Sequence, residues 1–158
     1  MFVQAVVACL LLASCQDQPT VYRDTSGVHL AGRIDKASAT ALRTELQDYD
    51  LLILDSDGGS LGAAIEIVAD VTIHHVSTRV ERDCASACAL VFGAGLHRTV
   101  STGARIGVHE ASQAIGDGIQ AEMLRMAGAP LSVISGMFST PPQLVYWLNS
   151  HEITAWIR

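Results

Sequence analysis

The feature that most limits the fold of this chain is the continuous apolar run Leu-Leu-Ile-Leu at residues 51–54. A strand that carries apolar side chains on both faces is typical of a parallel sheet whose faces are covered. The run ends in Asp55-Ser56-Asp57-Gly58-Gly59, a cluster of turn-forming residues. Apolar residues at helical spacing follow over residues 60–72. The sequence therefore predicts a strand, a tight turn and a helix in succession.

Strand and helix patterns alternate along the rest of the chain. Further strands are predicted at residues 28–32, 76–80, 98–100 and 105–108. Further helices are predicted at residues 35–47 (capped by Asp35), from residue 86 to about 92, and from 119 onward. This alternation indicates one α/β domain over residues 28–158 with mainly parallel pairing. We expect residues 51–55, 76–80 and 105–108 to be neighbouring strands of its core.

Two regions are predicted to be irregular. The charged residues 81–83 are expected to form a loop before the helix at residue 86. Breaks in the last helical region are expected at Gly128, Pro130, Gly136 and Pro141-Pro142.

The composition excludes some classes of partner. With 158 residues, the chain has the length of one domain with a sizeable core. The formal net charge is −6, and Lys36 is the single lysine of the sequence. A chain without a basic cluster lacks the electrostatic footprint of a nucleic-acid-binding protein, so no nucleic-acid partner is expected.

The N-terminal residues resemble an export signal. Residues 3–13 are almost entirely apolar, too few to span a bilayer comfortably, and Leu12-Ala13-Ser14-Cys15 resembles a bacterial lipobox. We therefore expect residues 1–14 to be a signal peptide and Cys15 to be lipidated, followed by a polar linker over residues 15–27. The expected location is the periplasmic side of the cell envelope, with a lipid anchor in the membrane. The alternatives are a mis-assigned start of the sequence and a buried N-terminal helix.

Cys84 and Cys88 form an even pair outside that segment. In an oxidising compartment they could form a disulfide, because residues one helical turn apart are close enough to bond. Two small buried thiols are the alternative. Two cysteines without a nearby ligand pair are too few for zinc, so neither a metal nor a cofactor is expected.

Ser86 and His109 are the candidate catalytic pair. Ser86 lies between two alanines, and small neighbours would let a carbonyl substrate approach the backbone closely. His109 follows the predicted strand at residues 105–108 and could accept the serine proton. The pair Gly58-Gly59 could offer an unobstructed N–H to an oxyanion.

The three motifs together resemble the ClpP/crotonase-like superfamily, and most closely its small exported ClpP-like serine hydrolases. The resemblance covers roughly residues 28–112. It implies a ClpP/crotonase-like spiral of ββα-type units, with Ser86 as nucleophile and His109 as general base. It also implies an oxyanion hole formed by the N–H groups of Gly59 and Ala87. The substrate would be a peptide or an ester, and the chain could form a homo-oligomer, because the superfamily commonly assembles as trimers or stacked rings.

One element of the family pattern is missing. The family places an aspartate, which orients the histidine, shortly before a pair that opens the last helical segment. Trp147-Leu148 resembles that pair here, but residues 143–146 contain no acid. The chain is also shorter than usual between His109 and this pair. Asp117, expected in the loop after His109, is the nearest substitute. A serine–histidine dyad, a replaced acid and an inactive enzyme all remain open.

Other functions are less well supported by the sequence. A serine–lysine dyad would have to use Lys36, near the start of the first predicted helix. A crotonase-type acyl-CoA enzyme would not need Ser86, and coenzyme A is not expected outside the cytoplasm. The main alternative is a catalytically inactive envelope lipoprotein that uses the fold as a binding module.

Overall fold

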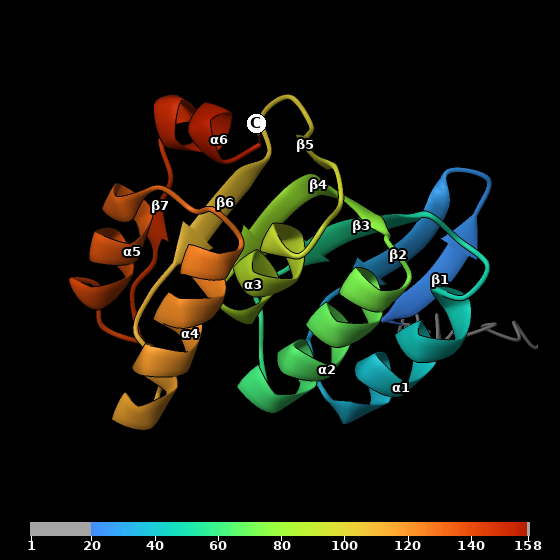
Figure 1. Cartoon of the computed structure of the whole chain (residues 1–158), viewed down its shortest axis with the longest axis horizontal. Coiled ribbons are helices and arrows are strands. Elements are labelled where there is room, and N and C mark those ends of the chain that lie inside the picture. Colours follow the sequence, from blue (N-terminus) through green and yellow to red (C-terminus); the bar gives the residue numbers. More distant parts are fainter. Residues whose placement is uncertain (1–19, 158) are drawn as a thin grey trace, which may run out of the picture.

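A computed structural model describes residues 20–157 of the chain (Figure 1). The apolar run at residues 51–54 lies in strand β3, and Leu52, Ile53 and Leu54 of this run are buried. The strands of the described residues are β1 (Val21–Asp24), β2 (Gly27–Ala31), β3 (Leu51–Ser56), β4 (Ser77–Ala85), β5 (Arg98–Val100), β6 (Arg105–Val108) and β7 (Tyr146–Trp147).

Within residues 20–157 these strands form one mixed sheet with the order β1-β2-β3-β4-β6-β7, and β5 also pairs with β4. The pairs around the centre, β2–β3, β3–β4, β4–β5 and β4–β6, are parallel. The outer pairs β1–β2 and β6–β7 are antiparallel. Strands β3, β4 and β6 are neighbours, which confirms the arrangement predicted for the core.

Strand β4 is longer than predicted, and the expected loop at residues 81–83 is wrong. These residues continue the strand, and two of them pair with charges on the neighbouring strands, whereas Glu81 pairs with Arg79 of β4 itself. Arg82 binds Asp55 of β3, and Asp83 binds Arg105 of β6. The first half of β4 pairs with β5 and its last residues pair with β6.

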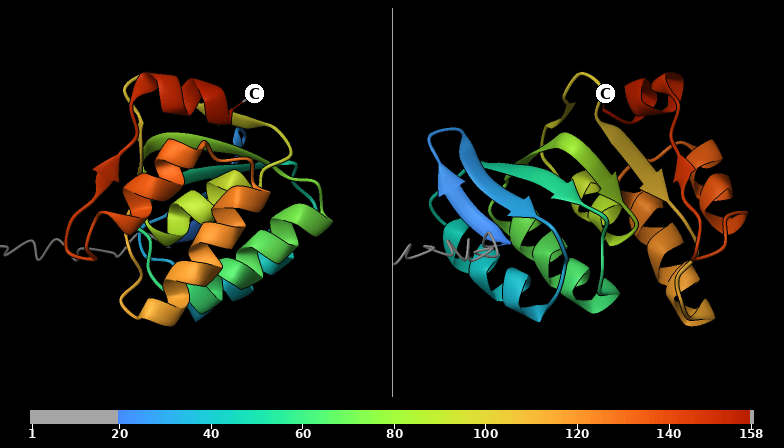
Figure 2. Two further views of the ribbon diagram at one scale, coloured as in Figure 1. Left: turned by 60° about the vertical axis from the view of Figure 1, so that its left-hand side comes forward. Right: turned by 180° about the vertical axis from the view of Figure 1, so that it is seen from behind.

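Helices connect the strands. They are α1 (Lys36–Glu45), α2 (Leu61–Ile73), α3 (Ala87–Gly93), α4 (Ala114–Met126), α5 (Leu131–Phe138) and α6 (Ser150–Trp156). Asp35 caps α1 and Ser60 caps α2 through side-chain bonds to backbone N–H groups. Helices α1 and α2 lie side by side, and α2 and α4 each contact α3 (Figure 1). Figure 2 shows from behind how the strands follow one another across the sheet.

The structure corrects four expectations in the second half of the chain and at the start of the domain. Helix α4 begins at Ala114 rather than 119, so Asp117 lies in its first turn and not in a loop. Gly136 lies inside α5 and does not break it; glycine is needed there because an added Cβ would lie 2.6 Å from the Tyr146 ring. Trp147 belongs to strand β7 and does not open the last helix, which begins after Asn149. Residues 21–24 form β1 instead of a linker.

The core lies between the sheet and its helices. Leu54 of β3, Ile67 of α2, Phe92 of α3 and Ile106 of β6 are fully buried in one apolar cluster. None of the helices in residues 20–157 has both the length and the apolar character needed to cross a bilayer. The predicted signal peptide and Cys15 lie outside the described residues.

Replacing a core side chain on β3 should destabilise the domain strongly. Leu54→Ala is expected to lower the free energy of unfolding by about 2–5 kcal/mol, because it removes fully buried apolar contacts and leaves a cavity. Leu144→Ala is the matched control, since Leu144 is 60% exposed, and should change stability by less than about 0.5 kcal/mol. Denaturant titration measures both, and equal effects of the two variants would contradict the assigned core.

Candidate active site

Ser86 occupies a sharp turn between strand β4 and helix α3. Its backbone adopts φ 58° and ψ −126°, a left-handed conformation that is rare for a residue with a side chain. The Ser86 N–H donates to the Gly107 carbonyl of β6 at 2.9 Å, which fixes the turn against the neighbouring strand. The serine side chain makes no helix-capping hydrogen bond. An unfavourable conformation that exposes an uncommitted hydroxyl is a common mark of functional sites.

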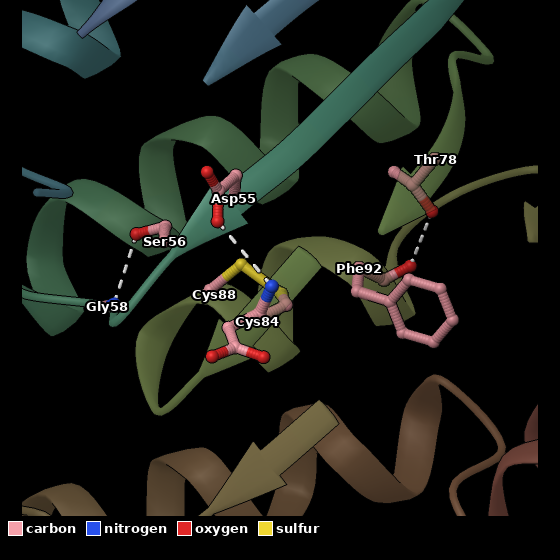
Figure 3. Close-up of a disulfide and its surroundings, with 8 residues drawn as sticks. Asp55, Ser56, Gly58, Thr78, Cys84, Cys88 and Phe92 are labelled. Atoms are coloured by element: carbon pink, nitrogen blue, oxygen red, sulfur yellow. Dashed lines mark hydrogen bonds between the residues drawn. A yellow bond between two sulfur atoms is a disulfide. The ribbon is translucent and has the colours of Figure 1, made fainter. Parts of the chain in front are cut away.

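The glycine turn after β3 lies directly against this serine turn. A Cβ added to Gly58 would lie 2.7 Å from the Ala85 oxygen, 2.8 Å from the Ser86 Cβ and 2.9 Å from the Ala87 nitrogen. Gly58 also has φ 94°, which favours glycine. Its N–H donates to the Ser56 hydroxyl at 3.0 Å (Figure 3). Glycine is thus required here both by the backbone conformation and by the close approach of the two turns.

Two backbone N–H groups near Ser86 are without an acceptor among residues 20–157. Ala87 begins α3, so its N–H has no partner within the helix. Gly59 forms a parallel bridge with Ile34. In this bridge the Ile34 N–H donates to the Gly58 carbonyl, and the Ser60 N–H donates to the Ile34 carbonyl. In a parallel bridge of this kind the N–H of the middle residue points away from its partner. The predicted oxyanion-hole donors are therefore both available.

Cys84 and Cys88 flank the serine turn at bonding distance. Their sulfur atoms are 2.04 Å apart, as in a disulfide, and their Cα atoms are separated by 5.2 Å. Cys84 lies in β4 and Cys88 in α3, so the bond joins the two elements on either side of Ser86 (Figure 3). Both residues are fully buried.

His109 follows directly after β6. Its Nδ1 lies 2.6 Å from the carbonyl oxygen of Glu110. Because a carbonyl oxygen can only accept, this contact assigns the proton to Nδ1 and leaves Nε2 as a hydrogen-bond acceptor. No hydrogen bond joins His109 to Ser86 in the described part of the chain, a separation that is common in sites without substrate.

Within residues 20–157, Asp117 makes no hydrogen bond to the imidazole of His109. Its carboxylate accepts a hydrogen bond from the Ala111 N–H at 2.6 Å. The partner of the His109 ring is a backbone carbonyl instead. Neither the Glu110 carbonyl nor the Ala111 N–H could have been identified from the sequence, because every residue carries these groups.

Ser86 and His109 line the same cavity, which has a volume of about 260 Å³. The walls of this cavity carry no charged side chain; they consist of Gly59, Leu61, Ser86, Ala87, His109, Ala111, Ser112, Gln113, Ile115, Gly116, Ile119 and Gln120. The structure thus brings Ser86, His109, Gly59 and Ala87 to one cavity, whereas Asp117 is not among the lining residues and its carboxylate accepts from the Ala111 N–H. Gln120, a buried amide in the cavity wall, was not singled out from the sequence, because a glutamine on a helix carries no distinctive signal.

Charged residues gather on the other side of the glycine turn. A second, more open depression of about 660 Å³ is lined by Arg33, Asp55, Asp57, Arg82 and Asp83 together with the glycine turn. The Arg105 guanidinium hydrogen-bonds to Asp83 and lowers the pKa of that carboxyl. Arg105 also lies over the Trp147 ring, 4.1 Å from its centroid. Arg82 is paired with Asp55 and Asp83 with Arg105, whereas Ser86 and His109 lie in the smaller, uncharged cavity.

Within residues 20–157, no group of three or more His, Cys, Asp or Glu residues is arranged to hold a metal ion.

Substituting Gly58 should disturb the site and the fold together. Gly58→Ala forces a side chain into an unfavourable φ, at about 1–3 kcal/mol, and also into contact with the serine turn, at about 1–3 kcal/mol more. Gly32→Ala is the control, because Gly32 has a similar φ of 99° but open space around it, so only the first cost applies. Thermal unfolding compares the two, and an equal loss of stability would refute the close packing at Gly58.

Comparison with known proteins identifies the fold. No protein-family model and no curated protein matches the sequence. The structure is similar to that of ClpP1 from Listeria monocytogenes, with a TM-score of 0.67 and 16% sequence identity over 82% of this chain and 85% of that one. A point mutant of the same protein matches with a TM-score of 0.57 and 17% identity over the same shares of both chains. The chain is therefore a single α/β domain with the ClpP/crotonase-like fold.

Proposed function

We propose that the protein is a ClpP-like serine hydrolase in which Ser86 is the nucleophile and His109 the general base. The observation that carries this proposal is the backbone of Ser86, held at φ 58° on the wall of a cavity that also contains His109. Two N–H groups without an acceptor, from Gly59 and Ala87, complete the set of groups needed for acyl transfer.

In the proposed reaction the Ser86 oxygen attacks the carbonyl carbon of the substrate. The hydroxyl proton passes to Nε2 of His109. Nε2 can accept it because the single N–H proton of the neutral ring is on Nδ1. The oxyanion is stabilised by the N–H groups of Gly59 and Ala87. The tetrahedral intermediate then collapses, and the leaving amine or alcohol takes the proton from Nε2. Water attacks the acyl-serine in the same way and regenerates the hydroxyl.

The cavity favours a neutral substrate group. Leu61, Ile115 and Ile119 supply apolar surface, and the remaining wall carries no formal charge. Burying a charged side chain there would leave it unpaired, at a high desolvation cost. We therefore infer a peptide or ester whose group beside the scissile carbonyl is apolar or uncharged. Assembly into a homo-oligomer stays a prediction from the resemblance.

Labelling with a fluorophosphonate probe tests the nucleophile. Ser86 should form a covalent adduct and Ser86→Ala should form none, because the probe reacts with serines that are activated by a base. Ser135→Ala, which removes an exposed serine on α5 outside the cavity, should label like the parent. Hydrolysis of a neutral thioester or p-nitrophenyl ester should fall to the uncatalysed rate in Ser86→Ala alone. A parent protein that neither labels nor hydrolyses would favour the inactive binding module.

We further propose that the protein acts on the periplasmic side of the envelope, anchored by lipid at Cys15. The bonded pair Cys84–Cys88 supports an oxidising compartment, because structural disulfides seldom persist in the cytosol. The lipobox-like sequence supports the anchor.

Replacing Cys15 tests the anchor. Cys15→Ala should move the protein from the membrane fraction to the soluble fraction or block its processing, since the acceptor of the lipid is lost. Cys9→Ala removes a cysteine from the same segment and should leave the protein in the membrane fraction. Detection of the full-length parent in the cytosol, with Met1 retained, would overturn the proposed location.

A further inference from the structure

One peptide group lies between His109 and Asp117. The carbonyl of Glu110 and the N–H of Ala111 belong to the same amide. On one side its oxygen lies 2.6 Å from Nδ1 of His109, and on the other its nitrogen donates to the Asp117 carboxylate at 2.6 Å. The carboxylate, the amide and the imidazole therefore form a continuous chain of two hydrogen bonds.

Such a chain has a definite electronic consequence. A carboxylate that accepts from an amide N–H increases the negative charge on the carbonyl oxygen of that amide, because the two ends of the peptide group are conjugated. The carbonyl of Glu110 then becomes a better acceptor for the Nδ1 proton. The effect resembles that of an aspartate placed directly against the ring, although it is weaker because it passes through the peptide group.

The elements around this amide hold it in place. The N–H of Glu110 donates to the Thr140 carbonyl at 2.8 Å, so the segment after β6 is tied to the residues that follow α5. Asp117 stands in the first turn of α4, a helix of 13 residues, and fixes the same segment from the other side. The carbonyl of Glu110 cannot rotate away from His109 without breaking the bond to Asp117.

We propose that Asp117 is a positioning residue for His109 and acts through the Glu110–Ala111 peptide group. It holds the ring in the form protonated at Nδ1, so that Nε2 faces the cavity as an acceptor. The catalytic significance of this arrangement rests on the proposed hydrolase function, but the arrangement itself does not. In this way a carboxylate that acts through a peptide group, and does not touch the ring, replaces the missing aspartate of the family pattern.

Nitrogen-15 NMR of the whole protein tests the arrangement without requiring activity. At a pH where His109 is neutral, its ring nitrogens should show the Nδ1-protonated form in the parent, with a strongly deshielded Hδ1 resonance. Asp117→Ala should shift the population toward the Nε2-protonated form and weaken or abolish that resonance. Asp117→Asn keeps an acceptor for the Ala111 N–H but loses the charge. It should therefore preserve the Nδ1-protonated form and move the Hδ1 resonance toward that of a weaker hydrogen bond.

A matched control distinguishes the effect of the Asp117–Ala111 hydrogen bond from the effect of removing any negative charge from α4. Glu122→Gln removes one negative charge from the same helix α4, where the Glu122 carboxylate binds Arg125. It should leave the His109 spectrum unchanged. Unchanged His109 tautomer and Hδ1 resonances in both Asp117 variants would overturn the proposal, as would the same change in Glu122→Gln.

Kinetics then tests the catalytic part. Where the parent hydrolyses an ester, kcat should fall about 10- to 100-fold in Asp117→Ala and less in Asp117→Asn, with KM nearly unchanged, as expected for a residue that orients a catalytic group. A parent without activity whose spectra still respond to Asp117 would refute the hydrolase function and support the positioning role. An active parent whose spectra and kcat do not respond would refute the positioning role alone.

Discussion

The candidate site depends on the way strand β4 pairs with its two neighbours. Its last residues pair with β3 through Cys84 and Ser56, and with β6 through Ala85 and Gly107. Because all three strands are parallel, their carboxyl ends meet at one edge of the sheet. The glycine turn, Ser86 and His109 each follow one of these ends, so a single set of backbone hydrogen bonds brings the three together. A shift in the register of β4 would move Ser86 away from both other segments.

The backbone conformation of Ser86 has a free-energy cost that the contacts around it offset. A left-handed conformation for a residue with a side chain costs about 1–3 kcal/mol. Three contacts hold the turn in place. They are the hydrogen bond from the Ser86 N–H to the Gly107 carbonyl, the packing of Gly58 against the turn, and the Cys84–Cys88 bridge. The bridge closes a very short loop, so it removes little entropy from the unfolded chain, and its main effect is local. We infer that it holds β4 and α3 in the angle that presents the serine hydroxyl.

The histidine illustrates how a pattern can change while its physical role is kept. An orienting acid fixes the proton on Nδ1 and leaves Nε2 free. In this chain the Glu110 carbonyl makes that contact, and Asp117 binds the same peptide group from behind. The sequence pointed to Asp117 as the nearest carboxylate, but it could not show that the contact with the ring passes through an amide. A carboxylate that acts on the ring through a peptide group should polarise the Nδ1–H bond less than one that accepts from Nδ1 directly.

The sequence by itself determined the alternation of strands and helices, the buried strand β3, and the neighbouring positions of β3, β4 and β6. These follow from local apolar patterns and from the rules of parallel connection. It also indicated Ser86, His109, Gly59 and Ala87, which line one cavity. Only the tertiary structure decided the extension of β4 through its charged residues, the short strands β1 and β7, and the start of α4. Several of those elements depend on partners far away in the chain, such as Arg105 for Asp83 of β4 and Gly107 for Trp147 of β7, and such contacts leave no local pattern. Only the structure decided that the N–H groups of Gly59 and Ala87 have no acceptor within residues 20–157, and that the Glu110 carbonyl lies beside His109. Backbone groups are the same at nearly every residue, and the fold decides where they point.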